Sequence, residues 1–284
     1  MNRRQKRKVI KVTILSAALS AMGLGTGIAA YSLIGKPVPD RFGCYNEAPR
    51  NGHYVLTDVS SPRFSVEQSR SLRRWFDQSF SLLGFNELFA VFTSEQREIA
   101  SIAAPSFHVC GPARNSDQLE AIGADEVSAG YLNKQAARLY DKQLAPELEA
   151  LLDPNPPKDR QQVHQSPVLE LIGDLSRAPS FTSVRKLTVI SDGVQNGLGG
   201  HFCFEKGALP PFKSFARRGV YERLKPEPLN GIEVEFLMLE RPGYGKGSMK
   251  YCTETELRRF WTDYFKANSA ASVKLIRIRA GTEG

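Results

Sequence analysis

Two aspartates stand where two short apolar runs end: Asp58 follows residues 54–57, and Asp192 follows residues 187–191. A stretch rich in turn-forming residues comes after each aspartate. In an open α/β sheet, ligands bind just beyond the carboxyl ends of the strands, where the strand order reverses. Two carboxylates brought to that edge from distant parts of the chain would suit a hard cation or a polar ligand.

The segments that must position these aspartates alternate between strand-like and helix-like patterns, which is typical of an α/β fold. The expected strands are short apolar runs bounded by turn residues. They cover residues 54–57, 88–93, 106–109, 186–191, 232–239 and 273–278.

Two helix starts carry a capping box, in which a hydroxyl side chain and a polar side chain three residues later satisfy each other's backbone N–H. Ser65 with Gln68 forms one box, and Thr253 with Glu256 forms the other. Apolar and aromatic residues recur at helical spacing after each box, so both helices should pack against the sheet. A further helix is expected over residues 131–152, interrupted at its single proline.

The charge of the chain is concentrated at its N-terminus. The 284 residues carry a formal net charge of +8, but six basic residues lie among the first 11, with no acid before Asp40. Without those six, the chain has 32 basic and 30 acidic residues. The folded part therefore has no general bias towards phosphate, and we expect no nucleic-acid partner.

Residues 12–35 contain no formal charge and are numerous enough to cross a bilayer as a helix. We interpret residues 1–11 as a basic cytoplasmic tail, 12–35 as a transmembrane signal-anchor, 36–49 as a linker and 50–284 as the folded domain. The positive-inside rule then sends that domain to the periplasmic or extracellular side. The alternative is a cleaved secretory signal. Gly23 and Gly27 have the small-xxx-small spacing that would let two anchors dimerise.

All four cysteines, Cys44, Cys110, Cys203 and Cys252, lie beyond the anchor. An even number of cysteines in an exported domain predicts disulfides, with three connectivities open. Their spacing matches no zinc site.

Three motifs in this order resemble a von Willebrand factor A-type (VWA-like) domain over about residues 50 to 280. They are Asp58-Val59-Ser60 after a strand, Ser166-Pro167 before a helix, and Ser191-Asp192-Gly193 after a later strand. The resemblance implies a Rossmann-like three-layer α/β sandwich whose mostly parallel central sheet has one antiparallel edge strand. It also implies a metal-ion-dependent adhesion site for Mg²⁺ or Mn²⁺, with Asp58, Ser60, Ser166 and Asp192 as ligands.

One position departs from the family motif, because Pro62 stands where the family has a second serine. Water could replace that ligand at reduced affinity, or the edge could be a degenerate, metal-free recognition face. Each residue also has a local explanation: an aspartate at a strand end commonly forms a turn, and Ser166 before Pro167 would be a good helix N-cap.

The disulfide pairing follows from the same family topology. Cys203 and Cys252 lie just past two loops expected at the same sheet edge, so their disulfide would tether those loops. The antiparallel third strand implied by the resemblance would bring Cys110 close to Cys44.

The chain lacks the Gly-x-Ser-x-Gly, His-Glu-x-x-His and Asp-x-Asp motifs of hydrolases and phosphatases, and we assign no catalytic residue. We expect a membrane-anchored extracytoplasmic recognition module that binds a protein partner not identified by its sequence. Two alternatives stay open: a hydrolase that holds a divalent ion with Asp58 and Asp192, or a purely structural domain.

Overall fold

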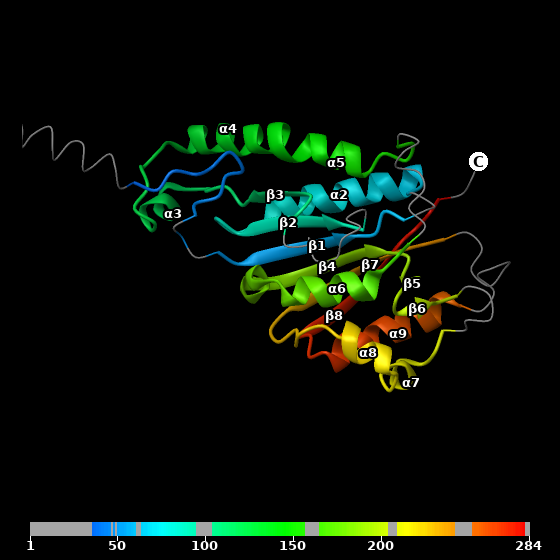
Figure 1. Ribbon diagram of the computed structural model, residues 1–284. Coiled ribbons are helices and arrows are strands. Elements are labelled where there is room, and N and C mark those ends of the chain that lie inside the picture. The colour runs from blue at the N-terminus through cyan, green and yellow to red at the C-terminus, as the bar shows by residue number, and fades with distance from the viewer. Residues whose placement is uncertain are drawn as a thin grey trace, which may run out of the picture.

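The computed structural model describes residues 36–46, 48, 50–60, 64–94, 104–156, 165–203, 209–241 and 252–281. A six-stranded sheet with the order β3-β2-β1-β4-β7-β8 runs through the centre of this structure (Figure 1). Neighbouring strands are parallel except β2 and β3, which are antiparallel at one edge. The strands are β1 (Gly52–Thr57), β2 (Leu88–Thr93), β3 (Phe107–Cys110), β4 (Val184–Ser191), β7 (Glu233–Leu239) and β8 (Ser272–Ile278).

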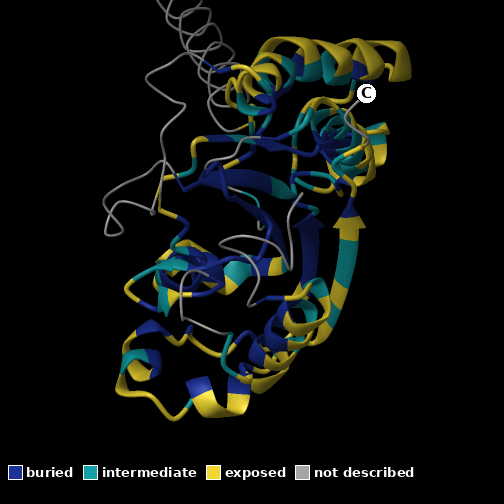
Figure 2. Cartoon of the chain, turned by 90° about the vertical axis from the view of Figure 1, so that its right-hand side faces the viewer, coloured by how far each residue is buried: buried dark blue, intermediate teal, exposed yellow. Residues whose placement is uncertain are grey.

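This architecture confirms the predicted α/β class, with a mostly parallel sheet and one antiparallel edge strand. Each expected strand is present, and its ends lie within two residues of those predicted. The strands in the middle of the sheet are buried on both faces, as parallel strands covered by helices must be (Figure 2).

Helices cover both faces of the sheet and make three layers (Figure 1). Side chains alternate along β1, so that Tyr54 and Leu56 join one hydrophobic cluster while Val55 joins the other. The first cluster packs against α6 (Val168–Arg177), α7 (Phe212–Phe215), α8 (Gly219–Leu224) and α9 (Glu254–Ala267). The second packs against α2 (Val66–Leu82), α4 (Ala129–Leu139) and α5 (Ala145–Leu151). A shorter helix, α3 (Ser116–Glu120), belongs to a small separate cluster.

Both predicted capping boxes are present. The Ser65 hydroxyl accepts a hydrogen bond from the Gln68 backbone N–H, and the Gln68 side chain accepts one from Ser65 in return. Thr253 and Glu256 form the same pair at the start of α9. The apolar residues predicted on the inner face of α9 are buried: Leu257, Phe260, Trp261, Tyr264 and Phe265.

The helical stretch predicted over residues 131–152 is interrupted earlier than expected. A π-helical turn, η2 (Tyr140–Leu144), separates α4 from α5, and Pro146 lies just inside α5. Because proline has no N–H and crowds the carbonyl four residues before it, regular α-helix is disfavoured immediately upstream. The proline therefore changes the helix in the preceding turn.

Both predicted disulfides are confirmed. Cys44 bonds to Cys110, Cys203 bonds to Cys252, and the cysteines have no free thiol. The first bond holds part of the expected linker against the antiparallel edge of the sheet. Cys44 and Tyr45 are buried there, and the Tyr45 N–H donates to the Asn86 side chain at 2.8 Å. The folded unit thus includes residues before position 50.

Several predicted features lie outside the described residues: the basic tail 1–11, the anchor 12–35 with Gly23 and Gly27, and Pro62. Within the described ranges, no helix combines the length and the apolar character needed to cross a membrane.

Candidate functional site

The carboxyl ends of β1 and β4 lie side by side at the centre of the sheet, and the strand order reverses between them. After β1, the chain forms β2 and then β3 on one side of β1. It then returns to form β4 on the other side of β1. The Asp58 backbone N–H donates to the Ile190 carbonyl at 2.8 Å, which fixes the end of β1 against the end of β4. Asp58 and Asp192 therefore meet at the topological switch point, where α/β sheets bind ligands.

The Asp58 carboxylate accepts four hydrogen bonds. One oxygen accepts from the Ser60 backbone N–H at 3.0 Å and from the Ser94 hydroxyl at 3.2 Å. The other accepts from the Ser166 hydroxyl at 2.5 Å and from the Ser191 hydroxyl at 3.0 Å. These five buried residues are called the Asp58 network below. An ionised carboxylate offers about four acceptor positions, so its hydrogen-bonding capacity is filled.

Asp192 lies beside this network and has its own partners. One carboxylate oxygen accepts from the Val194 N–H at 2.9 Å, and the other accepts from Nε of Arg241 at 2.9 Å. Burial raises the pKa of Asp192, the Arg241 charge opposes that rise, and the Asp58 charge adds to it. Burial of the carboxyl is therefore the main reason for the raised pKa of Asp192, and the nearby Asp58 charge is a smaller one.

The turn after Asp192 depends on glycine. Gly193 has a φ of +79°, and a Cβ at this position would lie 2.9 Å from the indole nitrogen of Trp261. That nitrogen donates to the Gly193 carbonyl at 2.9 Å. Only glycine combines this backbone conformation with such a close approach, which explains the Asp-Gly pair at the end of β4.

The structure brings Asp58, Ser60 and Ser166 into direct hydrogen-bond contact, with Asp192 as their charged neighbour. Both aspartates also form the local turns expected of them, through backbone N–H groups two residues further on. The alternative role of Ser166 as a helix cap is wrong: α6 begins at Val168 without a side-chain cap, because the hydroxyl donates to Asp58.

From the sequence, no role in the site was assigned to three of its members: Ser94, Arg241 and Ser191, the last of which was named only as part of a motif. Ser94 follows β2, so the strand-end rule that identified Asp58 could have found it. Ser191 is the last residue of β4. Arg241 follows β7 and is buried against Asp192, but its sequence context resembles that of any loop arginine.

The hydrogen bonds and the ion pair seen here disfavour Mg²⁺ or Mn²⁺ at these carboxylates. A hard cation needs oxygen ligands with lone pairs directed at it, but the Asp58 oxygens are filled by four hydrogen-bond donors. Asp192 is paired with a guanidinium, whose positive charge would repel a divalent ion at the same carboxylate. Among the described residues, Arg241 supplies a buried positive charge at this edge.

The Asp58 network also supports a surface hairpin. Ser166 and Asn196 exchange two backbone hydrogen bonds, of 2.8 and 3.0 Å. The hairpin formed by β5 (Asn196–Gly197) and β6 (Gly200–His201) begins at this bridge. Buried Glu170 accepts from the Gly199 N–H at 2.8 Å and from the Gln195 side chain at 2.6 Å. The buried polar groups therefore fix the base of a hairpin whose Leu198 is 76% exposed.

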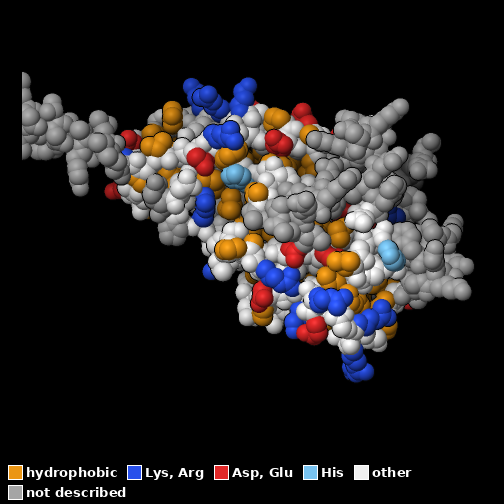
Figure 3. Space-filling model, in the orientation of Figure 1, with side chains coloured by type: hydrophobic (Ala, Val, Ile, Leu, Met, Phe, Trp, Pro, Cys, Tyr) orange, Lys and Arg blue, Asp and Glu red, His pale blue; other side chains and the backbone are white. Residues whose placement is uncertain are grey.

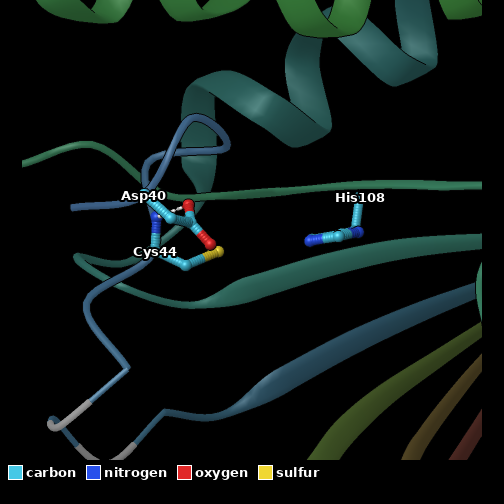
Figure 4. Close-up of side chains that lie close together, drawn as sticks. All are labelled: Asp40, Cys44 and His108. Atoms are coloured by element: carbon cyan, nitrogen blue, oxygen red, sulfur yellow. Dashed lines mark hydrogen bonds between the residues drawn. The ribbon is translucent and has the colours of Figure 1, made fainter.

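A second grouping, of Asp40, Cys44 and His108, has ligand-type atoms within 4.8 Å of one another (Figure 4). Cys44 is half of a disulfide and has no thiolate to offer a metal. One Asp40 oxygen accepts from the Phe42 and Cys44 N–H groups, both at 2.9 Å. These contacts hold the turn before the disulfide. With Asp40 used in this way and Cys44 in a disulfide, the three residues do not form a set of metal ligands.

The chain matches no protein-family model and no curated protein.

Proposed function

We propose that this protein is a membrane-anchored extracytoplasmic recognition module with a VWA-like domain, which binds a protein partner at the carboxyl edge of its sheet. The strand order and the antiparallel edge strand support the family resemblance. The two disulfides support an oxidising compartment, as expected for the outer side of a membrane.

The observation that carries this proposal is the fixed hairpin above the Asp58 network. Binding residues are commonly found on loops that a rigid scaffold holds in place. Here buried side chains from segments far apart in sequence converge beneath one short hairpin. An apolar side chain surrounded by polar groups, like Leu198 between Asn196 and His201, is a common arrangement at protein interfaces.

The same contacts favour recognition over hydrolysis. A metal-dependent hydrolase needs a carboxylate that can accept an ion and a water at an open position. The Asp58 oxygens are filled, and Asp192 is held by Arg241. We therefore infer that recognition at this edge is independent of metal and that Arg241 supplies the compensating positive charge.

Photocrosslinking in intact cells tests this function. A photoreactive residue at Leu198 should crosslink to a discrete partner, whereas one at Leu82 should not. Leu82 is a matched control, because it is 73% exposed but lies at the far end of α2 from the network. The Leu198→Asp substitution should abolish co-purification of the same partner. Equal crosslinking from both positions, or co-purification unaffected by Leu198→Asp, would contradict a binding site on this hairpin.

A further inference from the structure

A basic pocket lies on the opposite side of the domain from the Asp58 network, between residues 39–45 and the α4–η2 helix. Its volume is about 420 Å³, within the range of small-molecule sites. Four cationic side chains line it: Arg41, Lys134, Arg138 and Lys142. The only acidic residue among its lining residues is Asp40, and one Asp40 oxygen already accepts two backbone N–H groups.

Three of the cations form a stripe along one helical face. Lys134, Arg138 and Lys142 are spaced four residues apart, and all three are exposed. Within the part of the chain that the structure describes, none of the three has a salt-bridge partner. In Figure 3, Lys and Arg side chains gather over α4. Unpaired cations that line one cavity favour an anionic ligand.

The lining also includes apolar and aromatic side chains. Tyr45 and Leu139 are buried in the lining, and Tyr131 is 56% exposed. The π-helical turn supplies Lys142 and Gln143, and such turns occur frequently at functional sites. A ligand that combines a phosphate with an apolar portion would match both kinds of surface.

The pocket lies close to the proposed anchor. The anchor is expected to end at residue 35, and Arg41 lies only six residues later in the sequence. A fully extended chain of that length spans about 20 Å. We propose that this pocket binds the phosphate headgroup of an anionic phospholipid in the membrane that holds the anchor. That the ligand comes from a membrane depends on the proposed anchor. That the ligand is anionic depends only on the cations that line the pocket.

Native mass spectrometry of the full chain in an uncharged detergent tests the ligand. The probes are dihexanoyl phosphatidylglycerol, dihexanoyl phosphatidylcholine, inorganic phosphate and a polyglutamate peptide. One phosphatidylglycerol should bind saturably and more tightly than the other probes. At about 1 kcal/mol for each cation that meets an anionic headgroup, which is about fivefold in affinity, the double variant Lys134→Gln, Arg138→Gln should bind phosphatidylglycerol about 25-fold more weakly.

The matched control is Lys213→Gln with Arg217→Gln, which removes two exposed cations with the same spacing on and just after α7. It should bind phosphatidylglycerol like the unmodified chain. Equal binding of the two lipids, or equal losses in both double variants, would overturn the proposal. Free phosphate binding as tightly as the lipid would indicate a phosphate site, and tighter binding of polyglutamate would indicate an acidic protein partner. Alkaline extraction of membranes tests the anchor separately, and crosslinking from Leu198 tests the recognition edge.

Discussion

Removing the Ser166 hydroxyl is the most direct test of the Asp58 network. This hydroxyl donates to the Asp58 carboxylate at 2.5 Å, and both side chains are at least 95% buried. Ser166→Ala removes a single oxygen and leaves the backbone bridge to Asn196 intact. The carboxylate then loses one of its four donors in a place that water does not readily reach.

The expected cost follows from the chemistry of that bond. A hydrogen bond to a charged group contributes about 1.5–3 kcal/mol, compared with about 1 kcal/mol for a neutral one. We therefore expect Ser166→Ala to lower the free energy of unfolding by about 2 kcal/mol. For a domain of this size, that loss lowers the melting temperature by roughly 4–8 °C. Ser191→Ala should cost a similar amount, because Ser191 donates to the same oxygen.

Tryptophan fluorescence during thermal unfolding measures this effect in the full chain. Both tryptophans, Trp75 and Trp261, belong to the folded domain. Ser81→Ala is the matched control, since the Ser81 hydroxyl is exposed and donates to a neutral carbonyl. Its effect should stay within about 0.5 kcal/mol.

A double-mutant cycle with Asp58→Asn tests whether the charge of Asp58 strengthens the hydrogen bond from Ser166. If the Ser166 bond is strengthened by the carboxylate charge, Ser166→Ala should cost about 1 kcal/mol less in the Asp58→Asn background. An equal cost in both backgrounds, or a cost no larger than that of Ser81→Ala, would refute the assignment of Asp58 as a saturated buried carboxylate.

Three further predictions concern His53, the second disulfide and the binding of metal ions. Burial lowers the pKa of His53 to about 3, so the unfolded chain binds a proton that the folded chain does not between about pH 6.5 and 3. The free energy of unfolding should therefore rise with pH across that window, by up to about 1.4 kcal/mol per pH unit. The His53→Gln variant should lack this rise. If the variant and the unmodified chain showed the same dependence of unfolding free energy on pH, the prediction would be wrong. The Cys203–Cys252 disulfide spans 49 residues, so replacing both cysteines by serine should reduce denaturant stability by about 4 kcal/mol, and unchanged stability would argue against the bond. Titration of the full chain with Mg²⁺ or Mn²⁺ should give no saturable heat, whereas saturable binding lost in Asp58→Ala would restore the metal-site hypothesis.

The family resemblance predicts both a fold and a metal site, and these two predictions depend on different residues. The mostly parallel sheet and its antiparallel edge strand are present, and they depend on the hydrophobic pattern of the whole domain. A metal site depends on a few side chains at one edge. One buried arginine beside Asp192 changes the charge at that edge without changing the fold.

The sequence alone determined the features that depend on near neighbours. Strands were visible as short apolar runs, and both capping boxes were visible because their partners lie three residues apart. The aromatic inner face of α9 followed from helical periodicity. Each of these features involves contacts or repeats within a few residues, where the spacing in sequence is also the spacing in space.

Only the tertiary structure decided which hydrogen-bond partner each polar side chain uses. Ser166 can cap a helix or donate to a distant carboxylate, and the buried charge of Asp58 is the stronger acceptor. Ser94 and Ser191 reach the same carboxylate from positions 36 and 133 residues away in sequence. Arg241 meets Asp192 because β7 lies next to β4. No local pattern encodes these contacts, because the packing of the sheet creates them.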